Sequence, residues 1–150
     1  MGNYTARPVT ETELKDIIES IVSGYTDAHG VPHKPNKQVA TILTLQANIG
    51  CLISDICALT IESLVKSGDA WKLDVTENGM PISYTISNHA KAIIDAWTQE
   101  KGINSGNLFS INEYAVWKQL RGVTSYLELE NVSTHSIRHY YRERSHHGND

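Results

Sequence analysis

The residues best suited to chemistry lie near the end of the chain, in the segment 132–141. His135 precedes Arg138 by three residues at the start of an expected helix, so the imidazole and the guanidinium share one helix face, about one turn apart. Arginine matches phosphate oxygens with two parallel hydrogen bonds, and histidine can donate to a third oxygen or transfer a proton. The pair is therefore a candidate phosphoryl-transfer site; the alternative is a solvated or capping pair on a helix surface.

The composition predicts one folded domain that spans residues 1–150. With 40% hydrophobic and 20% charged residues, the chain can bury a core and differs from disordered sequences. The formal net charge of -4 argues against a generally basic nucleic-acid binder, although histidines and arginines concentrate in the segment 135–147. Cys51 and Cys57 provide no disulfide framework, and no apolar run approaches the roughly 18 residues of a membrane span. We therefore expect a cytoplasmic protein that does not enter a membrane.

Helix signals recur along the chain, and these helices must position the candidate residues. Capping boxes at 10–13 and 110–113 predict two helix starts, because a Ser or Thr three residues before Glu satisfies free backbone N–H groups. The segment 37–49 is apolar nearly all round, which predicts a central helix that is buried on most sides and ends at Gly50. Asn88 is the expected cap of a further helix.

A β-hairpin is expected to interrupt these helices. The segments 71–76 and 82–86 alternate in polarity and are rich in β-branched or aromatic residues, and Asn78-Gly79 between them is a strong turn signal. The segment 25–36 contains a glycine and two prolines, which predicts a loop. Together the signals predict an α+β fold that is mainly α, with a small antiparallel β-hairpin or three-stranded sheet.

The order of these features resembles the catalytic domain of the tyrosine recombinases, the phage-integrase family. The segment 7–14 resembles the opening of that domain, and the segment 50–59 resembles its first box, usually Gly-Leu-Arg-Ile-Ser-Glu/Asp-Leu-x-x-Leu. The hairpin falls where the family has one that carries a catalytic lysine, and the segment 134–139 resembles the His-x-x-Arg box. The match spans most of the chain. It implies the helical recombinase fold and a function in DNA integration or site-specific recombination.

The resemblance implies chemistry without a metal or another cofactor. In the family, a tyrosine attacks a DNA phosphate, arginines and histidines hold the phosphoryl oxygens, and a lysine protonates the leaving 5′-oxygen. For this chain it implies that Arg138 and His135 are the phosphate-binding catalytic residues and that Asp55 supports them. A zinc site is the alternative for His135 and His139, but with His146 and His147 nearby no clear third ligand is supplied, so we expect no metal.

Three features depart from the family pattern. Leu52 stands at the position of the first arginine, and loss of one oxyanion donor commonly costs roughly 3 to 4 kcal/mol of transition-state stabilisation. Glu77 aligns with the hairpin lysine to within a residue or two, and a carboxylate there would repel phosphate. The chain ends at Asp150, before the expected Gly-His box and nucleophilic tyrosine, and Tyr140 and Tyr141 are too close to the His-x-x-Arg box to replace it. We therefore expect a degenerate domain whose C-terminal part is missing.

The main prediction is a cleavage-deficient fragment or degenerate relative of an integrase that binds DNA weakly. Lys34, Lys37, Arg142 and Arg144 are the candidate DNA contacts, and the alternative that these charges only solvate the surface remains open. A second hypothesis is a protein-interaction module. In the family, the segment after the His-x-x-Arg helix packs on the domain or on a neighbour, so its absence would expose an apolar groove for a second copy or a partner chain.

Overall fold

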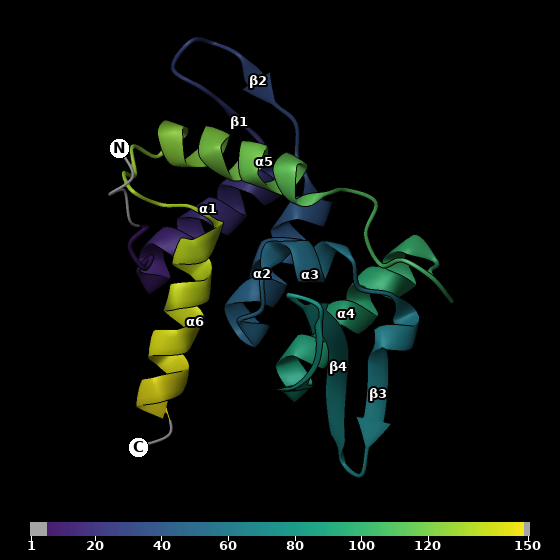
Figure 1. Cartoon of the computed structure of the whole chain (residues 1–150). Helices are drawn as coiled ribbons and strands as arrows, with labels where there is room; N and C mark the ends of the chain where they lie inside the picture. The colour runs from purple at the N-terminus through teal and green to yellow at the C-terminus, as the bar shows by residue number, and fades with distance from the viewer. Residues whose placement is uncertain (1–5, 149–150) are drawn as a thin grey trace.

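The computed structural model describes the backbone of residues 6–148 and the side chains of residues 6–144. Over this part of the chain it is mainly helical, with two small antiparallel sheets, which confirms the predicted fold class (Figure 1). No helix in the described part is long and apolar enough to cross a membrane. The α-helices are α1 (Glu11–Ser23), α2 (Lys37–Ile49), α3 (Ile53–Cys57), α4 (Asn88–Lys101), α5 (Glu113–Tyr126) and α6 (Thr134–Gly148).

The larger sheet contains the predicted hairpin. Strands β3 (Leu64–Ser67), β4 (Ala70–Glu77) and β5 (Met80–Ile86) are antiparallel in the order β3-β4-β5, after a short 3-10 helix at Ile61–Ser63. Asn78 and Gly79 both have positive φ, 54° and 77°, as a two-residue hairpin turn of type I′ requires. The sequence signals therefore located this turn correctly.

A second, two-stranded sheet lies in the segment that was predicted to be a loop. Strand β1 (Tyr25–Thr26) pairs with β2 (Pro32–His33) in antiparallel register. Each strand has only two residues, so neither could show the alternation in polarity by which strands are recognised in a sequence. Glycine and prolines were therefore correct indicators of a connecting segment, but they did not reveal its pairing.

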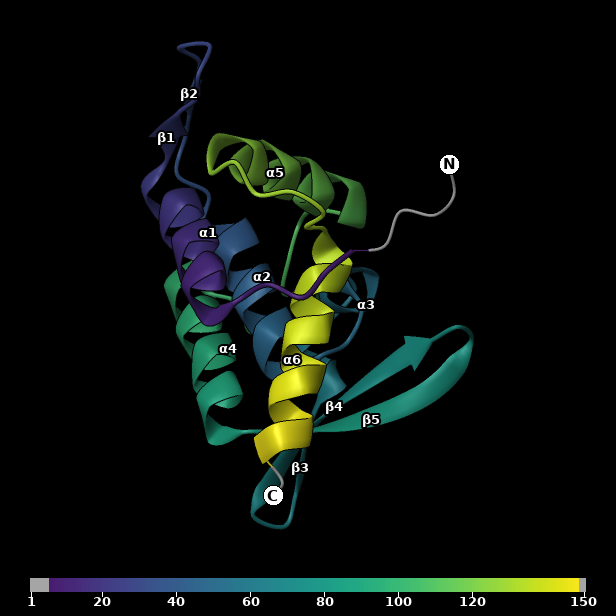
Figure 2. The ribbon, with the colours of Figure 1, turned by 90° about the vertical axis from the view of Figure 1, so that its left-hand side faces the viewer.

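Helix α2 is the centre of the core. Its side chains Ile42, Leu43 and Leu45 are fully buried, which confirms the prediction of a helix that is covered on most sides. Helices α1, α4 and α6 and the short α3 pack around it, while the β4–β5 hairpin projects to one side of the molecule (Figures 1 and 2). Burial of this many large aliphatic side chains is the main stabilising contribution in a domain of this size.

Gly50 brings α6 against the end of α2. It ends α2 in the left-handed conformation, with φ 85° and ψ 10°, a conformation that favours glycine. The ring of Tyr141 on α6 lies so close that a Cβ atom at position 50 would overlap it. The glycine therefore allows the two helices to approach, and it places the carbonyl of residue 50 beside the side chains of α6.

The helix caps agree in part with the capping boxes of the sequence. The box at Thr10 forms completely, with the threonine side chain and Glu13 exchanging hydrogen bonds with the backbone. The second box does not form, because Asn112 caps α5 and Ser110 instead bonds the side chain of Gln38. Helix α4 likewise begins one residue later than expected, with Ser87 rather than Asn88 as its cap.

Candidate phosphate site

Arg138 joins three parts of the fold that are far apart in the sequence. From α6 its Nε donates to the backbone oxygen of Gly50 at 2.9 Å, and its Nη2 donates to Oε1 of Glu77, at the end of β4, at 3.1 Å. The side chains of Arg138 and Glu77 are only 16% and 12% exposed. The arginine of the His-x-x-Arg pair thus forms a largely buried ion pair inside the protein.

Tyr84 engages the other oxygen of the Glu77 carboxylate. Its hydroxyl donates to Oε2 at 2.7 Å across the β4–β5 hairpin. This hydrogen bond, together with the positive charge of Arg138, lowers the pKa of Glu77. Burial and the hydrogen bond to Glu77 raise the pKa of Tyr84 to about 12, so its hydroxyl keeps its proton. Glu77 is therefore an ionised carboxylate whose two oxygens are both hydrogen-bonded.

Asp55, on α3, is a second carboxyl group at this site. Its pKa is raised, first by burial and then by the negative charge of Glu77. The buried Oδ2 atom of Asp55 has no N–H or O–H donor among the described residues. A proton on Asp55, donated in a hydrogen bond to Glu77, satisfies both groups and leaves the charge of Arg138 balanced by Glu77 alone.

Replacement of Asp55 with asparagine is expected to raise the free energy of unfolding at neutral pH, by roughly 1 kcal/mol or less. A carboxyl whose folded pKa is raised lowers stability as the pH climbs above the unfolded value of about 3.9, because the unfolded state then releases the proton more readily. The gain should therefore grow with pH and vanish in acid. Urea unfolding of both proteins at about pH 3.5, 5 and 7.5 measures it.

Asp69→Asn, in the exposed turn between β3 and β4, is the matched control and should leave stability nearly unchanged at each pH. An Asp55→Asn protein that is less stable than the wild type at neutral pH would show that the ionised carboxylate is the stabilising form at this position.

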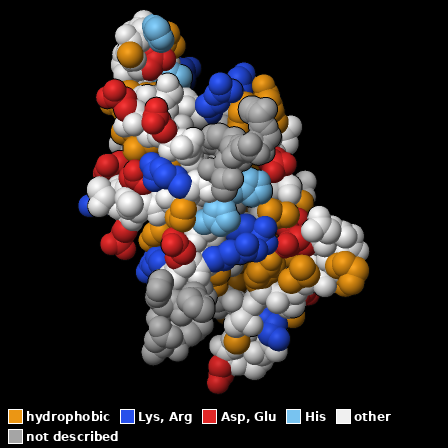
Figure 3. Space-filling model, turned by 60° about the vertical axis from the view of Figure 1, so that its left-hand side comes forward, with side chains coloured by type: hydrophobic (Ala, Val, Ile, Leu, Met, Phe, Trp, Pro, Cys, Tyr) orange, Lys and Arg blue, Asp and Glu red, His pale blue; other side chains and the backbone are white. Residues whose placement is uncertain are grey.

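His135 lies on the same helix face as Arg138 but faces solvent. His139 follows one turn later and is half-buried, and Arg142 one turn further on is exposed. Among the described residues, Arg142 forms no ion pair, although its charge is near enough to lower the pKa of Glu77. Figure 3 shows histidine side chains beside a group of lysine and arginine side chains on one face of the molecule. A polyanion could therefore approach α6 from this side.

The other predicted basic residues lie in different surroundings. Arg144 donates to the hydroxyl of Tyr140 at 2.9 Å, so its guanidinium is partly engaged. Lys37 begins α2 and forms an ion pair with Glu100, and Lys34 is exposed in the segment just before it. Since α2 has 13 residues, its first and last residues are about 18 Å apart along the axis. The two lysines thus lie at the opposite end of α2 from Arg138.

The side chains at the remaining site positions offer neither a cation nor a free nucleophile. Leu52 precedes α3 as its cap residue, and its alkyl side chain makes no capping hydrogen bond. Burial raises the pKa of the Cys51 thiol to about 12, so this cysteine is not a thiolate at neutral pH. Tyr140 is 7% exposed and the Tyr141 ring covers Gly50, which confirms that both tyrosines pack.

The metal alternative is tested only in part. Within the described part of the chain, no three His, Cys, Asp or Glu side chains come together in an arrangement that could hold a metal ion. The side chains of His146 and His147 lie outside the described residues.

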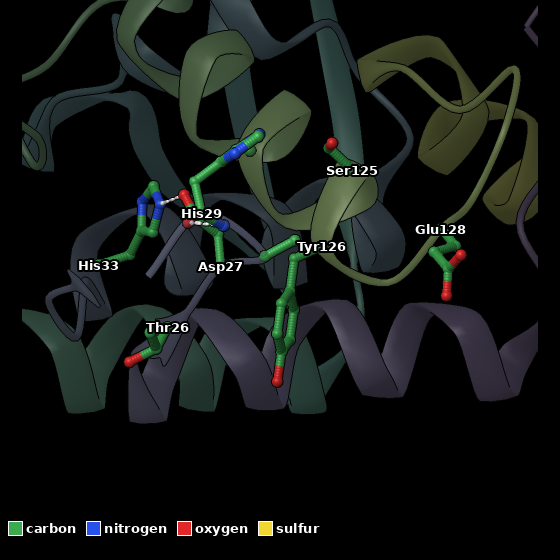
Figure 4. A pocket seen from close by; sticks show the side chains of 9 residues that line it. Thr26, Asp27, His29, His33, Ser125, Tyr126 and Glu128 are labelled. Atoms are coloured by element: carbon green, nitrogen blue, oxygen red, sulfur yellow. Dashed lines mark hydrogen bonds and ion pairs between the residues drawn. The ribbon is translucent and has the colours of Figure 1, made fainter. Parts of the chain in front are cut away.

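A separate hollow of about 580 Å³ lies between the β1–β2 segment and the end of α5 (Figure 4). Oδ2 of Asp27 contacts Nε2 of His33 at 2.9 Å, and the Tyr25 ring stacks between His33 and Tyr126 with centroid separations of 4.4 and 4.5 Å. Asp27 also accepts the backbone N–H groups of His29 and Val31. These contacts fasten the β1–β2 segment to α5, and they explain the polar side chains without a ligand.

Tyr84 is the residue that reasoning from the sequence missed, and Glu77 was only partly understood. The sequence indicated that a carboxylate at position 77 would repel phosphate, but not that it would pair with Arg138. The signal that could have found Tyr84 is the register of the hairpin. Because Asn78-Gly79 fixes a two-residue turn, Tyr84 must face Leu73, which puts its side chain on the face of the sheet that also carries Glu77.

Solved structures of tyrosine recombinases share this fold. A XerH site-specific recombinase bound to a palindromic difH substrate, in a post-cleavage complex, matches 99% of this chain with a TM-score of 0.70 and 14% identity. A XerA recombinase matches 100% of it with a TM-score of 0.69 and 14% identity. A lambda integrase(75-356) dimer bound to a COC′ core site matches 95% of it with a TM-score of 0.70 and 14% identity.

This chain corresponds to about half of each of those proteins, with coverage of 44%, 53% and 53%. No protein-family model matches the sequence, and no curated protein matches it. Identity this low shows the fold alone. The architecture is therefore that of the tyrosine-recombinase catalytic domain, as the sequence motifs predicted.

Proposed function

We propose that this protein is a recombinase-type DNA-binding domain that contacts DNA phosphates without cleaving the strand. The observation that carries the proposal is the ion pair between Arg138 and Glu77, inside a fold shared with recombinases that were solved on DNA. The carboxylate of Glu77 offers the guanidinium the same planar pair of oxygens that a phosphate would offer. The chain thus supplies an internal substitute for the phosphate.

The absence of cleavage follows from the charges at the site. A phosphate that reaches Arg138 must displace Glu77 or bear its repulsion, and Leu52 offers no second donor where the family has an arginine. Developing negative charge in a phosphoryl-transfer transition state is then left without the donors that normally stabilise it. We infer a degenerate catalytic site, in which His135 and Arg138 keep the family positions and Asp55 supports Glu77 rather than a reaction.

DNA contact is instead assigned to the exposed side of α6. His135, His139 and Arg142 follow one another along this helix face, and Arg144 lies near its end. So few cations on a chain with a net charge of -4 predict weak binding that depends strongly on salt. Lys34 and Lys37 would contribute only where a long duplex extends to the other end of α2.

Arg142→Ala is expected to weaken binding of a fluorescein-labelled duplex of about 30 base pairs, measured by fluorescence anisotropy at several salt concentrations. Removal of one phosphate contact should reduce the slope of log K against log salt by about 0.9. Arg144→Ala should act in the same direction but less, because Tyr140 engages that guanidinium. Lys34→Ala, at the far end of α2, is the matched control and should change the slope of a short duplex very little.

Two outcomes would contradict the proposed function. Anisotropy that does not change at low salt, or binding that is indifferent to salt, would count against phosphate contacts altogether. A covalent protein–DNA adduct on a denaturing gel, formed with a nicked suicide duplex, would show that strand cleavage persists despite the Arg138–Glu77 pair. The first result removes the DNA contact and the second removes the inactivity, so the two parts of the proposal are tested separately.

A protein-interaction role is the second candidate function, and one observation favours it. Tyr114 and Trp117 are exposed on α5, where each lies beside a cation. Exposed aromatic residues of this kind are typical of binding surfaces.

A further inference from the structure

Helix α5 carries aromatic and cationic side chains together on one exposed face. Tyr114, Trp117, Lys118 and Arg121 follow one another at helical spacings of three and four residues, so they form a single stripe. Tyr114 is 62% and Trp117 is 37% exposed. Large aromatic side chains are costly to leave in water, so a stripe that holds two of them calls for an explanation.

The stripe is an ordered arrangement. The rings of Tyr114 and Trp117 are tilted against each other at a centroid distance of 5.8 Å. The guanidinium of Arg121 lies 5.3 Å from the Trp117 ring centroid, and the Lys118 ammonium lies 6.0 Å from that of Tyr114. Over the described part of the chain, neither cation forms an ion pair. Both charges are thus held in place by aromatic rings and remain available to an anion.

A cleft opens beside the stripe. It has a volume of about 320 Å³ and lies between α5 and the segment that leads into α6, with Trp117, Leu120, Arg121, Val132 and Ser133 as its lining residues. Leu120 and Val132 make its floor apolar, and Arg121 borders it. A large aliphatic or aromatic side chain fits such a volume, and a carboxylate beside that side chain would meet the fork of the guanidinium.

We propose that the α5 stripe and its cleft bind a peptide segment of a partner protein that presents a large apolar side chain next to an Asp or Glu. The apolar side chain enters the cleft against Trp117, and the carboxylate pairs with Arg121. Tryptophan, tyrosine and arginine are the residues that most often dominate the energy of protein interfaces, and here they are adjacent. The surface is separate from the exposed side of α6, so it does not depend on the proposed DNA contact.

The charges at both ends of the stripe favour a peptide over a nucleic acid. Glu113 begins α5 beside Tyr114, and Glu128 and Glu130 follow the helix; all three are exposed. A polyphosphate along the stripe would be repelled at each end, whereas a short segment with one carboxylate meets only the central cations. The Trp117 ring also lies under Arg121, which leaves less of it free for base stacking than the open aromatic platforms of single-strand binders provide.

Selection from a random peptide library displayed on phage tests the proposal, with the full chain as bait. Enriched peptides should combine Leu, Phe or Trp with a neighbouring Asp or Glu. Their affinity, measured by titration calorimetry with synthetic peptides, should fall at least about tenfold with Trp117→Ala and with Arg121→Glu. A peptide in which Lys replaces the acidic residue should regain binding to Arg121→Glu. Lys66→Glu is the matched control, because Lys66 is an exposed cation over Trp71, at 5.7 Å, on β3.

Circular dichroism confirms that each variant folds, and Trp117→Phe provides a second, milder change. Three results would overturn the proposal: enriched peptides whose binding is unchanged by Trp117→Ala and Arg121→Glu, tighter binding of a single-stranded oligo-dT that is lost in Trp117→Ala, or self-association in sedimentation that Trp117→Ala abolishes. The second result would assign the stripe to single-stranded nucleic acid, and the third would assign it to another copy of this chain.

Discussion

Replacement of Arg138 with methionine is expected to lower the free energy of unfolding by about 3 kcal/mol. The substitution leaves the Glu77 carboxylate charged and only 12% exposed, with no cation beside it, and it removes the donor to the Gly50 carbonyl. Removal of one partner of a buried ion pair is costly because the other charge stays away from water. Urea unfolding followed by circular dichroism measures the loss.

Two further variants show whether the loss comes from the pair. In a protein that carries both Arg138→Met and Glu77→Gln, the unpaired charge is gone, so much of the stability should return. Arg142→Met removes an exposed arginine from the same helix and should change stability by less than about 0.5 kcal/mol. Equal losses for the Arg138 and Arg142 variants would mean that the ion pair with Glu77 contributes nothing to folding.

The fold could be predicted from local signals because each of them is complete within a few residues. The apolar run of α2, the Asn78-Gly79 turn and the capping box at Thr10 depend only on neighbours in sequence, and the structure contains all three. Strand β3 and the β1–β2 pair gave no such signal. Their partners are defined by the chain returning on itself, and short strands have too few residues to show a period.

The candidate site could be predicted only in its parts. Arg138 was identified by its motif, but its partner Glu77 is 61 residues away, and their meeting depends on how α6 crosses the end of α2. That crossing in turn requires Gly50, whose missing Cβ makes room for Tyr141. A motif states which residue types are present; it does not state which of them neutralise one another.

The basic residues illustrate the same limit. Lys37 and Arg142 looked equivalent as charges in the sequence, yet the structure separates them by the length of α2 and gives Lys37 a partner in Glu100. Charge alone therefore overestimated the number of residues that one DNA segment could contact. The remaining cations on α6 make a smaller surface, and the strength of that surface depends on whether Glu77 holds Arg138.

Replacement of Glu77 with glutamine is expected to raise the affinity for duplex DNA about tenfold at low salt. The amide removes the negative charge that now neutralises Arg138, and a neutral side chain competes less well than phosphate for the guanidinium. A hydrogen bond to a charged group contributes roughly 1.5 kcal/mol, which corresponds to about a tenfold change in affinity. Fluorescence anisotropy with the labelled duplex measures the gain, and the salt dependence should steepen by about one phosphate contact.

The gain should require Arg138, because that guanidinium is the group that Glu77→Gln releases. In the Arg138→Met background the same substitution is expected to leave affinity nearly unchanged. Glu100→Gln is the matched control, since it frees Lys37 from its ion pair at the far end of α2 and alters the net charge equally. If Glu100→Gln raised affinity as much as Glu77→Gln, the effect would come from net charge. The internal carboxylate would then have no particular role in closing the phosphate site.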